Sequence, residues 1–249
     1  RMPLKSTDFA PFMQRIKDSG AEAIYAFLPA GPTTLGFARA FSDTGLKAAG
    51  IKFFGPGDIT QEPDLPVLGD AAVGITTTFN YSQAHDSDLN RQFLAKHKEL
   101  FGSSDIVTFT SVGAYDGAHV IYRMVEATGG KSDGAKAVAA VKGMAWESPR
   151  GPVRIDPESR HVTQTIYLRV TERKDGRLQN TEVAGFPEQP DYGFKVGKYD
   201  HRRPPFPTGG GLVRAGVPDG NAFRHRGGRG RLRDDPVHHL GRPVGHARP

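Results

Sequence analysis

A glycine-rich turn that ends in an acid is the stretch of this sequence best suited to chemistry. Gly55, Pro56, Gly57 and Asp58 follow a short apolar run at 51–54. The run predicts a strand, and ligands bind beyond the carboxyl ends of strands in open α/β sheets. Two glycines let the backbone approach a ligand closely, and Asp58 supplies a fixed negative charge. The turn therefore predicts capture of a small cationic group.

Further candidates lie in the loops that follow the neighbouring predicted strands. These loops cover residues 29–32, 55–60 and 79–81. In a parallel sheet such loops gather at one edge, and a tyrosine near the start of a long predicted helix joins them. The candidate ligand-binding residues are Ala30, Gly31, Asp58, Tyr81 and Tyr115.

Each candidate also has a plain structural interpretation. Asp58 can shape the turn by accepting hydrogen bonds from the next backbone amides. Tyr81 and Tyr115 can be half-buried packing residues, and Ala30-Gly31 can be an ordinary turn. The sequence leaves these alternatives open.

Patterns that would indicate catalysis are missing or incomplete. The chain has no Gly-x-Ser-x-Gly elbow and no Gly-x-x-x-x-Gly-Lys-Ser/Thr phosphate loop. The segment 55–57 lacks the third glycine of a dinucleotide fingerprint, and Asp58 would repel a pyrophosphate. The series 85–88 (His-Asp-Ser-Asp) holds triad residue types, but neighbouring side chains at a helix start do not converge. We expect no enzyme activity, no cofactor and no metal; the chain also has no cysteine.

The elements that must position these residues are helices and strands in alternation. Helices are predicted between Asp8 and Gly20, from Thr33 or Thr34 to Gly45, from Asp86 or Ser87 through Phe101, and at 110–128 and 135–141. Strands are predicted at 23–28 (buried), 51–54, 72–77, 152–156, 162–170 and 178–183, the last two joined by a turn at 174–177. The order predicts an α/β fold, a parallel sheet flanked by helices, with a β-rich end. The segment 148–152 is expected to be a rigid polar turn.

The net charge of +6 belongs to the last fifth of the chain. The whole chain holds 33 basic and 27 acidic residues, and residues 201–249 hold ten Arg and three Asp of these. The first 200 residues therefore retain 23 basic and 24 acidic residues and are nearly neutral. No nucleic-acid partner is expected for this body. No apolar run approaches the roughly 18 residues of a membrane helix, nor does an apolar signal-peptide segment open the chain.

The segment 200–249 is rich in Arg, Gly, Pro and His and is predicted to be disordered, since it offers few large apolar side chains. Its run 224–231 looks like an arginine–glycine RNA-binding patch. Two other interpretations stand beside that one. The tail can be functionally neutral, or it can be a GC-rich reading frame translated out of register.

Several segments, each weak alone, occur in the order found in one known family. They are Phe54 to Glu62, Phe79 to Tyr81, Tyr115-Asp116, 147–152 and 155–157. Over about residues 4–192 the chain resembles the type I periplasmic-binding-protein superfamily, specifically the branched-chain amino acid substrate-binding proteins of ABC transporters. The resemblance implies a periplasmic or extracellular receptor that closes on a small amino acid or amide and delivers it to a membrane permease. A ligand-sensing domain of a receptor or regulator with the same fold is the alternative.

The resemblance also assigns parts and residues. Residues 1–80 resemble most of the second lobe, 81–150 a partial first lobe, and 151–199 the β-rich crossover segments. Asp58 falls one position from the family acid that holds a ligand ammonium. Tyr115 matches a cleft tyrosine, and Ala30-Gly31 falls near a ligand-contacting loop. Well over a hundred family residues that would precede Arg1 are missing, so we expect a carboxy-terminal fragment, with one lobe largely complete, that binds poorly alone.

Overall fold

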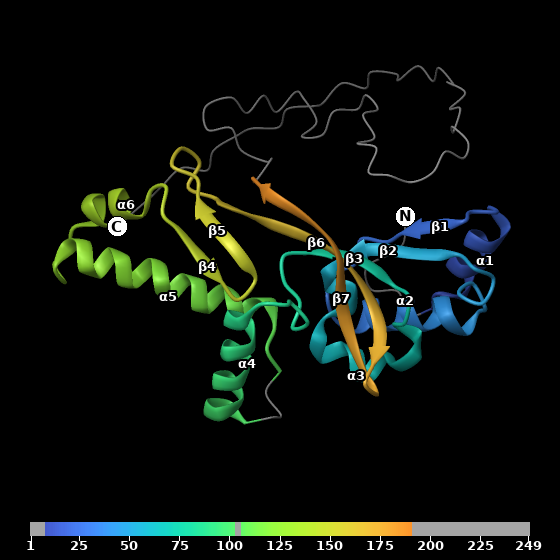
Figure 1. The fold of residues 1–249 in the computed structure, drawn as a ribbon. Helices are drawn as coiled ribbons and strands as arrows, with labels where there is room; N and C mark the ends of the chain where they lie inside the picture. Colours follow the sequence, from blue (N-terminus) through green and yellow to red (C-terminus); the bar gives the residue numbers. More distant parts are fainter. Residues whose placement is uncertain (1–7, 103–105, 191–249) are drawn as a thin grey trace, which may run out of the picture. The chain divides into compact units, whose positions relative to one another are not determined.

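The computed structural model describes residues 8–102 and 106–190 (Figure 1). The chain divides into two compact units, residues 1–205 and 206–249. All the described residues belong to the first unit, and the second unit lies outside them. The predicted tail at 200–249 and its boundary at 199 fall outside them as well.

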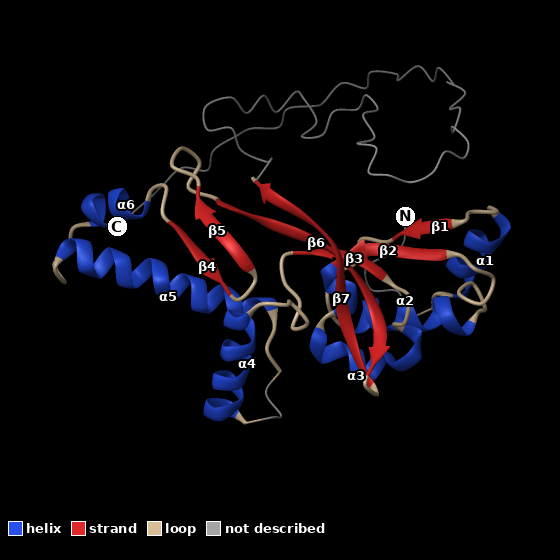
Figure 2. Cartoon of the chain, viewed as in Figure 1, coloured by secondary structure: helices blue, strands red, loops and turns tan. Residues whose placement is uncertain are grey.

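Residues 8–79 build a parallel sheet covered by helices. The helices are α1 (Ala10–Asp18), α2 (Pro32–Asp43) and α3 (Leu65–Leu68), with short 3-10 turns η1 (Gly57–Thr60), η2 (Glu62–Asp64) and η3 (Gly69–Ala71). The strands β1 (Ala23–Tyr25), β2 (Lys52–Pro56) and β3 (Thr76–Phe79) pair in parallel, in that order. Figure 2 shows α2 and α3 on one side of these strands. Phe37 and Phe41 of α2 pack against Phe53 of β2, with ring centroids 5.6 and 5.1 Å apart.

The prediction of a buried strand at 23–28 is wrong in both length and burial. The strand covers only Ala23–Tyr25, and it stands at the end of the strand order β1-β2-β3-β6-β5-β4. Tyr25 and Phe27 are 67% and 77% exposed. Among the described residues no strand pairs with the outer side of β1, and Tyr25 is exposed on that edge. The strand predicted at 72–77 also starts later, at Thr76, because Ala72 and Ile75 fill the core from a turn.

Residues 88–155 form three helices and a hairpin: α4 (Asp88–Phe101), α5 (Phe109–Thr128), α6 (Gly134–Val141), β4 (Ala145–Ser148) and β5 (Gly151–Ile155). The predicted helix ends are confirmed where the caps are strong. The Ser87 side chain accepts a hydrogen bond from the Asn90 amide at the start of α4, and Gly129 ends α5 with φ 60°. The turn predicted at 148–152 is confirmed: Pro149 and Arg150 form the hairpin turn, and Ser148 pairs with Gly151 at the adjoining ends of β4 and β5. No helix within the described ranges is long and apolar enough to span a membrane.

A long two-stranded ribbon joins these two groups of elements. It consists of β6 (Val162–Lys174) and β7 (Arg177–Gln189), and the predicted turn between them is confirmed, with Asp175 and Gly176 at φ 49° and 77°. The first residues of β6 pair antiparallel with β5. Residues 167–170 pair antiparallel with β3. One strand therefore serves both groups (Figure 1), and the α/β prediction is confirmed, with its parallel part confined to β1–β3.

The free edge at β1 should make the chain self-associate. Unpaired strand edges with apolar side chains template pairing with another chain, and a lysine on the edge discourages it. We expect the 249-residue chain to form oligomers whose size grows with concentration, and Tyr25→Lys to reduce them, measured by size-exclusion chromatography with light scattering. Tyr122→Lys removes a similarly exposed ring (66%) from α5 and should change the size less. A monodisperse monomer of the unchanged chain would contradict this expectation.

Candidate functional site

The end of β2 and the turn after it are built by close packing at two glycines, Gly55 in the strand and Gly57 at the start of η1. A Cβ on Gly55 would lie 2.1 Å from Cδ1 of Ile59 and 2.6 Å from the carbonyl oxygen of Ala26. A Cβ on Gly57 would lie 2.1 Å from Cγ of Phe79. The sequence predicts that these glycines let a ligand approach the backbone closely. In the structure, atoms of Ala26, Ile59 and Phe79 occupy that space. The glycines thus fix where Asp58 stands.

Asp58 is half-buried in η1, one residue beyond Gly57. Its Oδ1 accepts a hydrogen bond from Nε2 of Gln61, at 3.3 Å. The structure thus places a carboxylate at the carboxyl end of a parallel strand, held by a side chain of its own turn. Such a group can accept a hydrogen bond from a ligand ammonium or hydroxyl.

A buried arginine lies behind this turn. Arg169 of β6 is 0% exposed. Its Nη2 donates to Oγ1 of Thr77 at 3.2 Å and to the carbonyl of Gly57 at 3.5 Å. Its Nη1 donates to the carbonyl of Tyr81 at 2.5 Å, and its Cζ lies 4.9 Å from the ring centre of Phe79. One guanidinium therefore touches the turn, the end of β3 and the segment beyond it.

The charges around Arg169 compensate part of its burial. Burial lowers the pKa of Arg169, and the negative charges of Glu62, Glu182 and Asp58 oppose this shift. Oε1 of Glu62 lies 3.6 Å from Nη1. Asn180 on β7 donates to the same Glu62 oxygen at 3.2 Å and to the Thr60 carbonyl at 2.7 Å. The turn is thus anchored to both strands of the ribbon.

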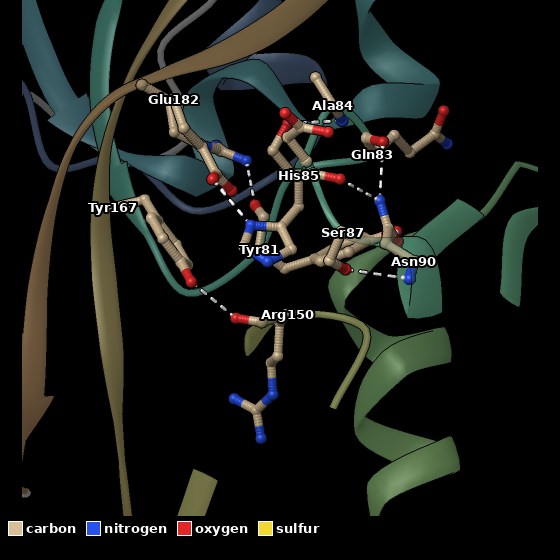
Figure 3. Close-up of polar contacts among 12 residues, drawn as sticks. Tyr81, Gln83, Ala84, His85, Ser87, Asn90, Arg150, Tyr167 and Glu182 are labelled. Atoms are coloured by element: carbon tan, nitrogen blue, oxygen red, sulfur yellow. Dashed lines mark hydrogen bonds and ion pairs between the residues drawn. The ribbon is translucent and has the colours of Figure 1, made fainter. Parts of the chain in front are cut away.

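Residues 80–87, the crossing segment, lead from β3 to α4 and are bound to the ribbon (Figure 3). Tyr81 is fully buried, and its hydroxyl donates to Oδ1 of Asn90 at 3.0 Å. Burial raises the pKa of Tyr81. Ser82 donates to the carbonyl of Asn180. Tyr81 is thus packed and hydrogen-bonded inside the chain, and a ligand-binding role for it stays a prediction.

His85 pairs with a residue of β7 and not with its neighbours in the series 85–88. Its Nδ1 lies 2.8 Å from Oε2 of Glu182, and its ring packs at a 54° tilt against Tyr167, with ring centroids 5.2 Å apart. The Tyr167 hydroxyl donates to the carbonyl of Arg150 at 2.8 Å (Figure 3). Ser87 is occupied as the cap of α4. The series forms no triad, as predicted.

Tyr115 lies on α5 and packs toward α4. Its ring centre is 5.2 Å from that of Phe93 and 4.8 Å from that of His119. The next residue, Asp116, is buried, and its two oxygens accept from Nε of Arg150 at 2.8 Å and from Nε1 of Trp146 at 2.9 Å. This pair fixes α5 against the β4–β5 hairpin, and with it the position of Tyr115.

Ala30 and Gly31 lie in the loop between β1 and α2, and Gly31 precedes the first residue of the helix with φ 119°. That conformation favours glycine, so the ordinary-turn interpretation fits Gly31. Ala30 is exposed.

A contact between two aromatic rings links the end of β3, next to the Asp58 turn, to the start of α5. The rings of Phe79, at the end of β3, and Phe109, at the start of α5, meet edge to face with centroids 4.9 Å apart. Phe79 is the ring that covers Gly57. Both rings are half-buried, and through Phe79 the pair borders the turn at Gly57, the residue before Asp58.

Sequence reasoning missed Arg169, Glu182 and Phe109 as site-forming residues. A signal existed for the first, because Arg169 shares one face of a predicted strand with Thr163, Thr165 and Tyr167. The structure buries that polar face and leaves the opposite, apolar face half-exposed. A buried arginine in a strand needs hydrogen-bond partners from elsewhere in the chain. Those partners must converge on the arginine, so its position in the sequence indicates a site-forming residue.

A groove of about 790 Å³ lies among α3, α4 and the β6–β7 turn, and its lining includes Glu62 and Asn180 from the surroundings of Arg169. Its lining includes none of the five predicted ligand residues. Within the described residues no cluster of three or more His, Asp or Glu is placed to hold a metal ion.

A parallel sheet with an acid at a strand end, linked to further helices by a crossing segment and a shared ribbon, is the plan of the type I periplasmic-binding-protein fold. The chain belongs to the periplasmic binding protein family, whose sequence pattern matches residues 1–177. It is 60% identical over 197 residues to "Leu/Ile/Val-binding protein homolog 6" of Brucella melitensis, a match that covers 79% of this chain and 50% of the relative.

Two solved structures are also similar. A solute-binding protein of an ABC transporter from Rhodopseudomonas palustris HaA2, in complex with p-hydroxybenzoic acid, is 57% identical with a TM-score of 0.74, over 78% of this chain and 53% of that one. A second, from R. palustris BisB5 with 3,4-dihydroxybenzoic acid, is 47% identical with a TM-score of 0.67, over 75% and 50%. The chain thus spans about half the length of the relatives it matches.

Proposed function

We propose that this chain supplies half of a periplasmic solute-binding protein that captures a hydroxylated aromatic acid for an ABC permease, without catalysis. The observation that carries the proposal is the acid Asp58 beside the aromatic pair Phe79–Phe109. A carboxylate accepts the hydrogen bond of a phenol, and aromatic rings favour edge-to-face contact with a ligand ring. The ligands of the two similar solved structures, both hydroxylated benzoic acids, support the same chemistry.

A branched-chain amino acid is the second candidate. The name of the Brucella relative favours it, and so does the position of Asp58, one residue from that of the family acid that holds an ammonium. Both ligand classes carry a carboxylate, so they differ at the end that meets Asp58: a phenol hydroxyl or an ammonium. The aromatic pair favours the first class.

The β6–β7 ribbon suggests how the residues of the chain are divided between two lobes. We propose that residues 1–80 form one lobe, that 81–150 belong to the other, and that 151–199 hold the crossovers. The pairing of β6 with both β3 and β5 supports this division. A dissociation constant near 1 μM needs about −8 kcal/mol. One wall of a cleft supplies only part of that, so this chain alone should bind weakly.

The decisive test is reconstitution. The 249-residue chain is titrated calorimetrically with 4-hydroxybenzoate, benzoate and leucine, alone and mixed with the part of the Brucella relative that it does not match. We expect no saturable micromolar binding alone, and saturable binding of 4-hydroxybenzoate, stronger than that of benzoate, in the mixture.

The role of Asp58 is tested in the same mixture. Asp58→Asn should weaken 4-hydroxybenzoate about tenfold, the loss expected for one charge-assisted hydrogen bond. Asp64→Asn, a similar change in the next turn, should leave affinity unaltered. Binding of leucine without 4-hydroxybenzoate would favour the second candidate. Binding of neither would refute a solute-binding role for this pairing.

A further inference from the structure

Arg169 occupies the point where the ribbon passes from one group of elements to the other. Toward the amino end of β6 the strand pairs with β5, and from residue 167 to 170 it pairs with β3. The register between β6 and β7 shifts between Leu168 and Arg169, so that Val183 of β7 is left without a Cα partner. Such a bulge bends the strand and increases its twist locally. The ribbon has a second such shift between Gln164 and Ile166, so Arg169 stands at one of two points where the described ribbon is expected to bend.

The guanidinium spans two segments that are 24 residues apart in the chain. It binds the carbonyl of Gly57, the residue before Asp58, and the carbonyl of Tyr81 in the crossing segment. Hydrogen bonds from an ionised donor are stronger than neutral ones, and the planar fork of arginine fixes the positions of its acceptors relative to each other. Thr77, between the two segments, is held by the same group.

Stability alone is a poor explanation for this arginine. Its Nε is buried without a hydrogen-bond partner in the described structure, and so is Oε1 of Glu182, its Cα partner across the ribbon. A buried charge with an unmet donor is costly, and well-packed apolar replacements of buried ion pairs are often neutral or stabilising. The geometry instead fits a residue that sets the position of its neighbours.

We propose that Arg169 is a positioning residue that holds the Gly57–Asp58 turn and the crossing segment 80–87 as one unit, so that bending of the ribbon carries Asp58 with it. The coupling between the two segments stands on the contacts alone. Its use in ligand capture rests on the proposed function.

Hydrogen exchange on the full 249-residue chain tests the coupling. We expect Arg169→Met to speed exchange at least tenfold in peptides covering both 57–61 and 81–85, while the α2 core, at 37–41, keeps its protection. Arg169→Lys, which retains the charge without the fork, should restore protection in one of the two segments at most. Arg150→Met removes the other buried arginine of the described residues. It should affect 112–116, 146–151 and, through Gln164, residue 80 at most, while 57–61 keeps its protection.

Two outcomes would overturn the proposal: loosening of only one segment in Arg169→Met, or the same loosening in Arg150→Met. If Arg169→Met does not fold, the unchanged chain is measured in low concentrations of denaturant. Amides of 57–61 and 81–85 must then open with the same free energy and the same denaturant slope, and unequal slopes reject the coupling. These results do not depend on ligand, so a failed titration leaves them intact.

Discussion

Replacement of Asp116 by alanine is expected to lower the free energy of unfolding by about 3–5 kcal/mol, because it leaves the guanidinium of Arg150 buried without its anion. Asp116 is the partner of Arg150 at 2.8 Å and of the Trp146 indole at 2.9 Å. Both contacts tie α5 to the β4–β5 hairpin. The loss is measured by urea unfolding followed by circular dichroism.

Two further variants separate charge from hydrogen bonding at this position. Asp116→Asn keeps an acceptor for Trp146 and should cost about half as much as alanine. The double variant Asp116→Leu with Arg150→Met removes both charges and should recover most of the loss. Asp86→Ala breaks a fully solvated ion pair with Arg91 and serves as the control, with no measurable change expected. A loss below about 1 kcal/mol for Asp116→Ala would show that the pair is not structural.

Gly57→Ala is expected to destabilise the chain by about 1–3 kcal/mol, through overpacking. The new methyl group would lie 2.1, 2.4 and 2.6 Å from Cγ, Cδ2 and Cβ of Phe79. The ring must then move, and it takes with it the contacts to Arg169 and Phe109. In the reconstituted mixture, ligand affinity should fall together with stability.

The matched control for this change is Gly113→Ala in α5. A Cβ there meets no atom within 4 Å. Alanine is favoured over glycine in a helix, so this variant should gain about 0.5–1 kcal/mol. Thermal unfolding of both variants checks the pair of expectations. Equal midpoints for Gly57→Ala and the unchanged chain would mean that Phe79 is not fixed by the turn.

The parts of the fold that were predictable from sequence are those with local causes. Ser87 begins α4 and Gly129 ends α5 because capping depends on residues within one turn. Asp175-Gly176 makes the ribbon turn because both residues accept positive φ. The α/β order followed from the same local patterns together with the family resemblance.

The parts that were not predictable depend on distant partners. Exposure of β1 follows from the absence of a strand on its outer side in the described structure, which its own sequence does not encode. The acceptors of Arg169 lie 88 and 112 residues away. The strand predicted at 51–54 ends two residues too early, because β2 continues through Gly55 and Pro56. The reason for the glycines was not predictable either, because Phe79 and Ala26 reach them from other elements.

The β6–β7 ribbon has a consequence for the order in which the protein is made. β3 is complete at residue 79, but its partner residues on β6 begin at 167. At about 5–20 residues per second, a nascent chain waits roughly 5–20 s with that strand edge open. During synthesis the β3 edge of the parallel sheet therefore stays open until the ribbon arrives to close it, and an open strand edge can pair with another chain.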